Sequence, residues 1–164
     1  MSGARTLLNT ATSDSSGKQK LASPRWAVIA LLVAALQCLL WGVFIIVWPE
    51  RSSLAYGFSQ PPTDLFLWQG TGLVIVLFGI GYRIAATNPL KHWNIVLIGF
   101  LGKSLGPIGM TWSVVHGRVS RRVLYLIPVN DLIWLIPFAL ILLLVYKNSG
   151  SARNEVRVGS IVMA

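Results

Sequence analysis

Hydrophobic and polar positions separate into long blocks along this chain rather than alternating. Four apolar blocks occupy residues 27–48, 66–86, 93–115 and 123–146, with short polar stretches between them. A helix rises about 1.5 Å per residue, so each block is long enough to cross a hydrocarbon core of roughly 30 Å. None shows the two-residue alternation over about ten residues that is typical of membrane barrel strands. The pattern therefore predicts an all-α integral membrane protein, a four-helix bundle.

Polar segments flank the apolar blocks at both ends of the chain. Residues 1–25 are rich in Ser and Thr and carry several basic residues. The first block is too long for a signal-peptide core, and the WPERSS stretch that follows it offers no small-residue cleavage site. We therefore expect a disordered basic tail over 1–25, a transmembrane domain over 26–146 and a mobile C-terminal tail over 147–164.

The distribution of positive charge predicts the orientation. The formal net charge is +9, and most of the basic residues lie at the ends of the apolar blocks, which favours contact with lipid headgroups over nucleic-acid binding. Placing both termini in the cytoplasm puts nine Lys and Arg residues inside and four outside, as the positive-inside rule requires. The arginine-rich loop over 116–122 opposes the rule, because it would lie outside.

The third block contains GFLGKSLGPIG over residues 99–109, in which Gly-Lys-Ser suggests a phosphate-binding loop. Such a loop needs a glycine at the position occupied by Leu97, and it needs exposed backbone N–H groups between a strand and a helix. Inside an apolar span the backbone satisfies itself as a helix, so no phosphate cradle is available. The nucleotide-binding interpretation is therefore rejected.

Glycines at helical spacing predict helix packing. They recur every three or four residues on one face of the third block and at an interval of seven residues in the second. Such faces let a second helix approach closely. The predicted packing residues are Gly99, Gly102, Gly106, Gly109, Gly72 and Gly79. Packing within the bundle and packing in a homodimer are both compatible with this pattern.

Two opposite charges lie deep in the last two blocks. Lys103 is about 15 Å from the inner surface and Asp131 about 12 Å from the outer one, so their depths nearly coincide. An isolated charge there costs several kcal/mol, and we therefore expect the two side chains to pair. Pro107 cannot donate to the carbonyl of Lys103, which leaves that oxygen for Ser104, water or a ligand. The predicted intramembrane polar site comprises Lys103, Asp131, Asn130, Gln37 and Ser104.

This polar layer has two interpretations. A partly hydrated Lys–Asp pair can serve as a site for a proton, an ion or a small ligand, with Trp41 and Trp134 as apolar walls. Alternatively, the pair fixes helix register and the amide side chains complete its hydrogen bonds. No catalytic residue, metal site or cofactor is predicted, because Cys38 is the only cysteine and the two histidines are expected on opposite sides of the membrane.

Three stretches carry a family resemblance: GIGYRIAATNPLKHW over 79–93, GFLGKSLGPIG over 99–109 and NDLIWLIPF over 130–138. Together they resemble small four-helix bacterial inner-membrane proteins of uncharacterised function and, more loosely, the DoxX-like families. The resemblance covers roughly residues 66 to 146 and implies a fold and a compartment. DoxX proteins are associated with quinone-linked sulfur oxidation, but no matching site is found in this sequence.

These observations lead to one expectation and two alternatives. The expected function is that of a small accessory or structural membrane protein whose polar layer holds the bundle together. The alternatives are a proton, ion or small-ligand transport or binding protein that uses the same layer, and a subunit of a quinone-linked membrane oxidoreductase. The expected partners are the lipid bilayer and either another membrane protein or a second copy of the chain, with no nucleic acid.

Overall fold

The computed structural model describes residues 23–162, and the chain there consists of helices and loops with no strand. The α-helices are α2 (Arg25–Val47), α3 (Pro49–Ala55), α4 (Leu65–Ala85), α5 (Trp93–Val115) and α6 (Ile133–Val162). A 3₁₀ turn, η1 (Arg121–Tyr125), and a π-helical turn, η2 (Pro128–Leu132), lead into α6. Within these residues, four helical stretches are long and apolar enough to cross a membrane, which confirms the predicted all-α multi-pass architecture.

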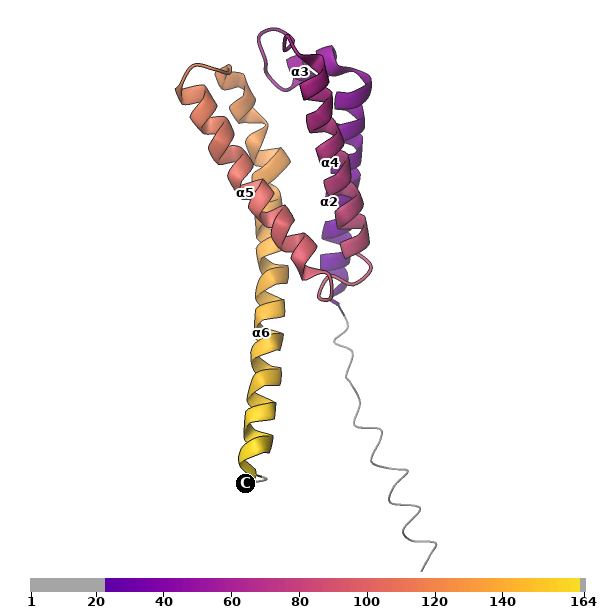
Figure 1. Ribbon diagram of the computed structural model, residues 1–164, viewed down its shortest axis with the longest axis vertical. Helices are drawn as coiled ribbons and strands as arrows, with labels where there is room; N and C mark the ends of the chain where they lie inside the picture. Colours follow the sequence, from indigo (N-terminus) through magenta and orange to yellow (C-terminus); the bar gives the residue numbers. More distant parts are fainter. Residues whose placement is uncertain (1–22, 163–164) are drawn as a thin grey trace, which may run out of the picture.

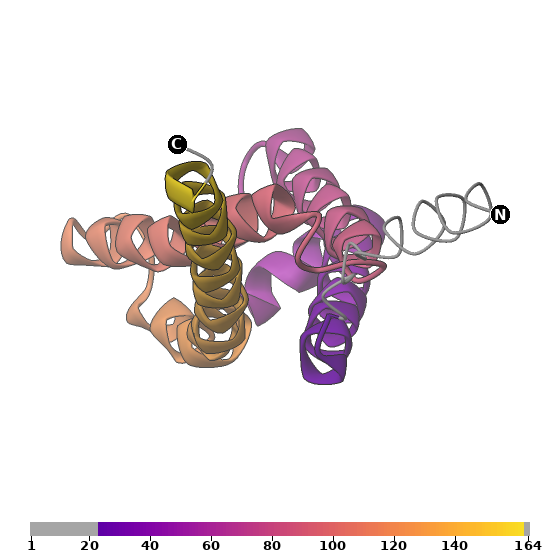
Figure 2. The same cartoon turned by 90° about the horizontal axis from the view of Figure 1, so that it is seen from below.

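The four long helices form two antiparallel pairs. α2 packs mainly on α4, and α5 packs mainly on α6. Figure 1 shows the two pairs meeting near the start of α5 and diverging towards the end that carries α3. Seen from below, α5 runs obliquely past the α2–α4 pair, and α6 crosses α5 in this view (Figure 2). The bundle is therefore closed at one end and splayed at the other.

Glycines allow α2 and α4 to touch through their backbones. A Cβ atom at Gly42 would lie 2.7 Å from the carbonyl oxygen of Gly72, and one at Gly72 would lie 2.7 Å from the side chain of Ile45. A Cβ atom added at Gly79 would likewise lie too close to the side chain of Leu39 on α2. The prediction that Gly72 and Gly79 form a packing face is therefore confirmed, and the partner is another helix of the same chain.

The glycine face of α5 is only partly used. Gly99 contacts the ring of Tyr82, where a Cβ would lie 2.5 Å from a ring carbon, and Gly102 makes an ordinary contact with Phe78. At Gly106 and Gly109 an added Cβ would meet no described atom within 4 Å. The oblique course of α5 explains the difference, because these two glycines lie where α5 has moved away from α4.

An apolar core fills the closed end. Tyr82 and Phe138 lie at its centre with their rings edge to face at 5.1 Å, and both are fully buried. Small side chains of α2 and α4 let the helices surround them: Ala27, Ala34, Ala35, Ala85 and Ala86. This core joins α4 to α6 and so connects the two helix pairs.

The structure departs from the predicted element boundaries in three places. The predicted span 123–146 begins with the turns η1 and η2 and is an α-helix only from Ile133 onwards. The loop after α2 contains α3, which begins with Pro49 at its first position and Glu50 in its first turn, both favourable at a helix N-terminus. In addition, α6 continues to Val162, whereas a mobile tail was expected from residue 147. No proline follows Pro137, so no residue in this stretch lacks the backbone N–H that a helix requires. The predicted N-terminal tail lies almost entirely outside the described residues.

Candidate intramembrane site

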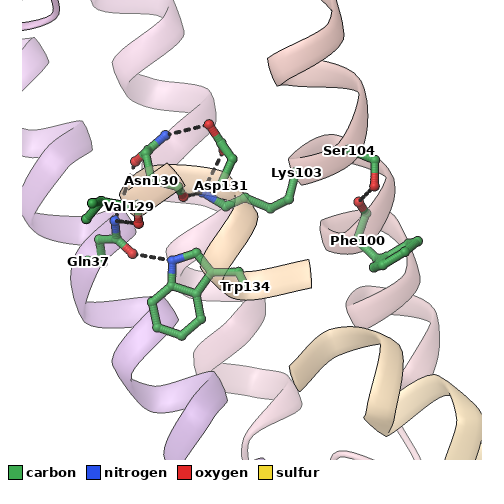
Figure 3. A network of polar contacts seen from close by, with 8 residues as sticks. All are labelled: Gln37, Phe100, Lys103, Ser104, Val129, Asn130, Asp131 and Trp134. Atoms are coloured by element: carbon green, nitrogen blue, oxygen red, sulfur yellow. Dashed lines mark hydrogen bonds and ion pairs between the residues drawn. The ribbon is translucent and has the colours of Figure 1, made fainter. Parts of the chain in front are cut away.

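The two deep charges form the centre of a polar layer. The Lys103 Nζ atom lies 3.2 Å from Asp131 Oδ1 and donates to the backbone carbonyl of Asn130 over 2.6 Å. Both side chains are largely buried, at 12% and 16% exposed. The predicted pairing is therefore confirmed, and it connects α5 to η2 (Figure 3).

The π-helical turn makes the Asn130 carbonyl available to the lysine. Pro128, at the start of η2, has no N–H group, and the N–H of Ile133 donates back to the carbonyl of Pro128, five residues earlier. This wider turn disturbs the regular four-residue pattern of helical hydrogen bonds. The carbonyls of Val129 and Asn130 consequently accept side-chain donors from other helices. Pro128 thus marks the place where the fourth span departs from regular α-helical geometry, whereas Pro137 lies inside the continuous helix α6.

Amide and indole side chains extend the layer to α2. Asn130 Nδ2 donates to Asp131 Oδ2 over 3.2 Å, so each carboxylate oxygen has a partner. Gln37 Nε2 reaches the Val129 carbonyl and the Asn130 side chain at 3.4 and 3.5 Å, while Gln37 Oε1 accepts from the indole of Trp134. Gln37 and Asn130 therefore join the site as predicted. Trp134, expected as an apolar wall, contributes a hydrogen-bond donor instead.

Ser104 does not join the polar layer. Its hydroxyl donates to the carbonyl of Phe100, one turn earlier in the same helix, over 2.8 Å. Figure 3 shows this pair apart from the network around Lys103. A serine in a helix commonly bonds the carbonyl four residues back, because that acceptor is always within reach. Ser104, expected in the polar site, therefore lies outside the hydrogen-bond network of the described residues.

A cavity of about 200 Å³ lies beside the ion pair, between the two helix pairs. Lys103, Asn130 and Asp131 provide its polar edge, and the rest of its lining is mostly apolar or aromatic. The predicted wall residue Trp41 does line it, and so do two tyrosines, Tyr56 and Tyr82. Sequence reasoning missed both tyrosines, because the glycine that makes room for the Tyr82 ring is Gly99, which lies on the next helix.

The loop after α3 covers the cavity at the splayed end. Gly57 has a φ of +95° and its Cα lies against η1, where a Cβ would be 2.8 Å from the backbone nitrogen of Val123. This turn directs Tyr56 between Trp41 and Trp68, with ring separations of 6.1 and 5.4 Å. Burial raises the pKa of the Tyr56 phenol to about 12, and the negative charge of Asp131 acts in the same direction.

Comparisons with family models, curated proteins and solved structures find no match to this chain. The interpretation of the site therefore rests on its own geometry.

Proposed function

We propose that this chain is a small accessory protein of the bacterial inner membrane, with both termini in the cytoplasm, whose polar layer holds one helix pair against the other. Support comes from the connections that the layer makes. Lys103 joins α5 to η2, and Gln37 joins α2 to the same turn. Lys103 thus holds α5 to η2 within one pair, and the contacts of Gln37 connect that turn to the other pair.

The hydrogen-bond geometry favours a structural role for the pair. Both carboxylate oxygens of Asp131 have donors, and both polar ends of Gln37 have partners. Buried polar groups that are satisfied in this way fix the register of helices, because any other register leaves them unpaired in lipid. A scaffold of this kind needs no chemistry of its own.

The distance between the splayed ends of α4 and α5 tests this proposal. Spin labels at Phe66→Cys on α4 and Val115→Cys on α5, in a Cys38→Ala background, report that distance in a bilayer by pulsed electron spin resonance. Both native side chains face outwards, at 80% and 76% exposure. Lys103→Met should broaden the distance distribution, and adding Asp131→Leu should narrow it again. Lys147→Met is the matched control, because it makes the same change at an exposed position.

An unchanged distance distribution in Lys103→Met would contradict the structural role.

The cavity beside the ion pair favours a second candidate function, that of a small-ligand binding or transport protein. The resemblance to DoxX-like proteins remains a prediction.

A further inference from the structure

Unused hydrogen-bond donors surround the cavity. The Lys103 ammonium has three N–H groups, of which two point to acceptors among the described residues, Asp131 and the Asn130 carbonyl. The phenol groups of Tyr56 and Tyr82 also line the cavity, and neither makes a hydrogen bond within the part of the chain that the structure describes. Tyr82 is only 1% exposed, so little of this side chain reaches the surface of the protein.

Trp41 supplies a fourth donor. Its ring lines the cavity, and its Nε1 atom is buried without a hydrogen-bond partner in the described residues. A buried N–H without an acceptor destabilises a fold, so a group of this kind needs an explanation. An occupant of the cavity that carries an acceptor atom provides one.

The charges of the site define what else the occupant must be. Lys103 and Asp131 neutralise each other, so a charged ligand would bring an unpaired charge into the interior of the membrane, where ions are strongly disfavoured. Most of the remaining lining is apolar, including Ile75, Phe78 and Leu126. A neutral molecule with a large apolar portion matches both features.

We propose that this cavity binds an uncharged, mainly apolar molecule that carries a hydrogen-bond-accepting oxygen, such as a ketone or an ester dissolved in the bilayer. The oxygen accepts hydrogen bonds from the indole N–H of Trp41, which has no other acceptor among the described residues, and from the tyrosine hydroxyls. The apolar portion lies against Phe78 and the aromatic rings near Tyr56. This inference goes beyond the proposed scaffold, because the polar layer can hold the helices with the cavity empty or filled.

Photolabelling of the full-length protein in bilayers with benzophenone tests the inference. Benzophenone is neutral, apolar and carries one carbonyl oxygen, and on irradiation it attaches covalently to nearby C–H bonds. Met110 lines the cavity and is a favourable target. Saturable labelling of the peptide that contains Met110, located by mass spectrometry, is the expected result.

Three competitors define the ligand class, each compared at equal concentration in the membrane. Phenyl benzoate is a neutral ester and should block the labelling. Diphenylmethane has two similar rings but no oxygen and should compete about tenfold more weakly, as expected when donors are left unpaired. Diphenylacetate adds a carboxylate and should compete more weakly than the ester.

Variants that remove single oxygen atoms connect the binding to the proposed donors. Tyr56→Phe and Tyr82→Phe should each weaken competition by phenyl benzoate about fivefold while leaving diphenylmethane unchanged. Tyr146→Phe is the matched control, because that tyrosine is 79% exposed on α6 and does not line the cavity. Equal competition by diphenylmethane, effective competition by diphenylacetate, or labelling confined to lipid-facing residues would each overturn the inference.

Discussion

Removal of the Lys103 charge should destabilise the protein, and removal of the Asp131 charge as well should restore most of the stability. Lys103→Met leaves the carboxylate with a single neutral donor, the Asn130 amide, at 16% exposure. Asp131→Leu leaves the ammonium with a single neutral acceptor, the Asn130 carbonyl. Each single change breaks a buried pair and should reduce the free energy of unfolding by about 3 kcal/mol.

The double variant carries neither charge and loses chiefly the hydrogen bonds to Asn130, which should cost about 1 kcal/mol. If the two sites were independent the double variant would lose about 6 kcal/mol, so the expected coupling energy between them is about 5 kcal/mol. Steric trapping or unfolding in mixed micelles measures these free energies, and Lys147→Met serves as control. A double variant that loses as much as the sum of the single ones would refute the pairing argument.

Three further predictions address packing, protonation and topology. Gly72→Ala should cost about 1–3 kcal/mol because its new methyl group meets Ile45 and the carbonyl of Gly42, whereas Gly106→Ala should stay within about 1 kcal/mol of the native protein, as measured in the same unfolding assay. The pKa of the Tyr56 phenol is raised to about 12 in the folded protein, against about 10 in the unfolded chain, so folding favours the neutral phenol. The contribution of this phenol to the stability of the protein is present below pH 10 and is lost as the pH rises towards 12. The stability of Tyr56→Phe should therefore fall less between those two values, and its alkaline absorbance titration should lack one phenolate that forms near pH 12. Identical curves would contradict this. Finally, green fluorescent protein fused to the C-terminus should fluoresce and alkaline phosphatase fused there should be inactive, and the reverse result would place the C-terminus outside.

The sequence predicted the spans and the ion pair because both follow from position along the chain. An apolar block must cross the bilayer, and its length fixes the depth of every residue in it, so Lys103 and Asp131 could be matched by counting. The short helix α3 was equally accessible, since Pro49 and Glu50 are typical of a helix start. These features depend on local sequence and on the thickness of the membrane.

The cavity could not be predicted in this way. It exists because α5 leans away from α4, and the degree of tilt depends on how whole helices pack rather than on any spacing of residues. Gly106 and Gly109 have the same spacing as glycines that do pack, yet they make no such contact. Ser104 shows a second limit of prediction from sequence. A serine hydroxyl can donate either to a carbonyl of its own helix or to an acceptor on a neighbouring helix, and the sequence contains both kinds of acceptor.

The π-helical turn η2 sets the rotation of α6 about its own axis, and so decides which residues of α6 face the interior of the bundle. An α-helix turns by about 100° per residue, so one residue added to or taken from the chain there would carry Phe138 and Ile141 from the interior of the bundle towards the lipid. Point changes at the exposed positions of this turn, such as Val129, should be tolerated far better than insertions or deletions of a single codon.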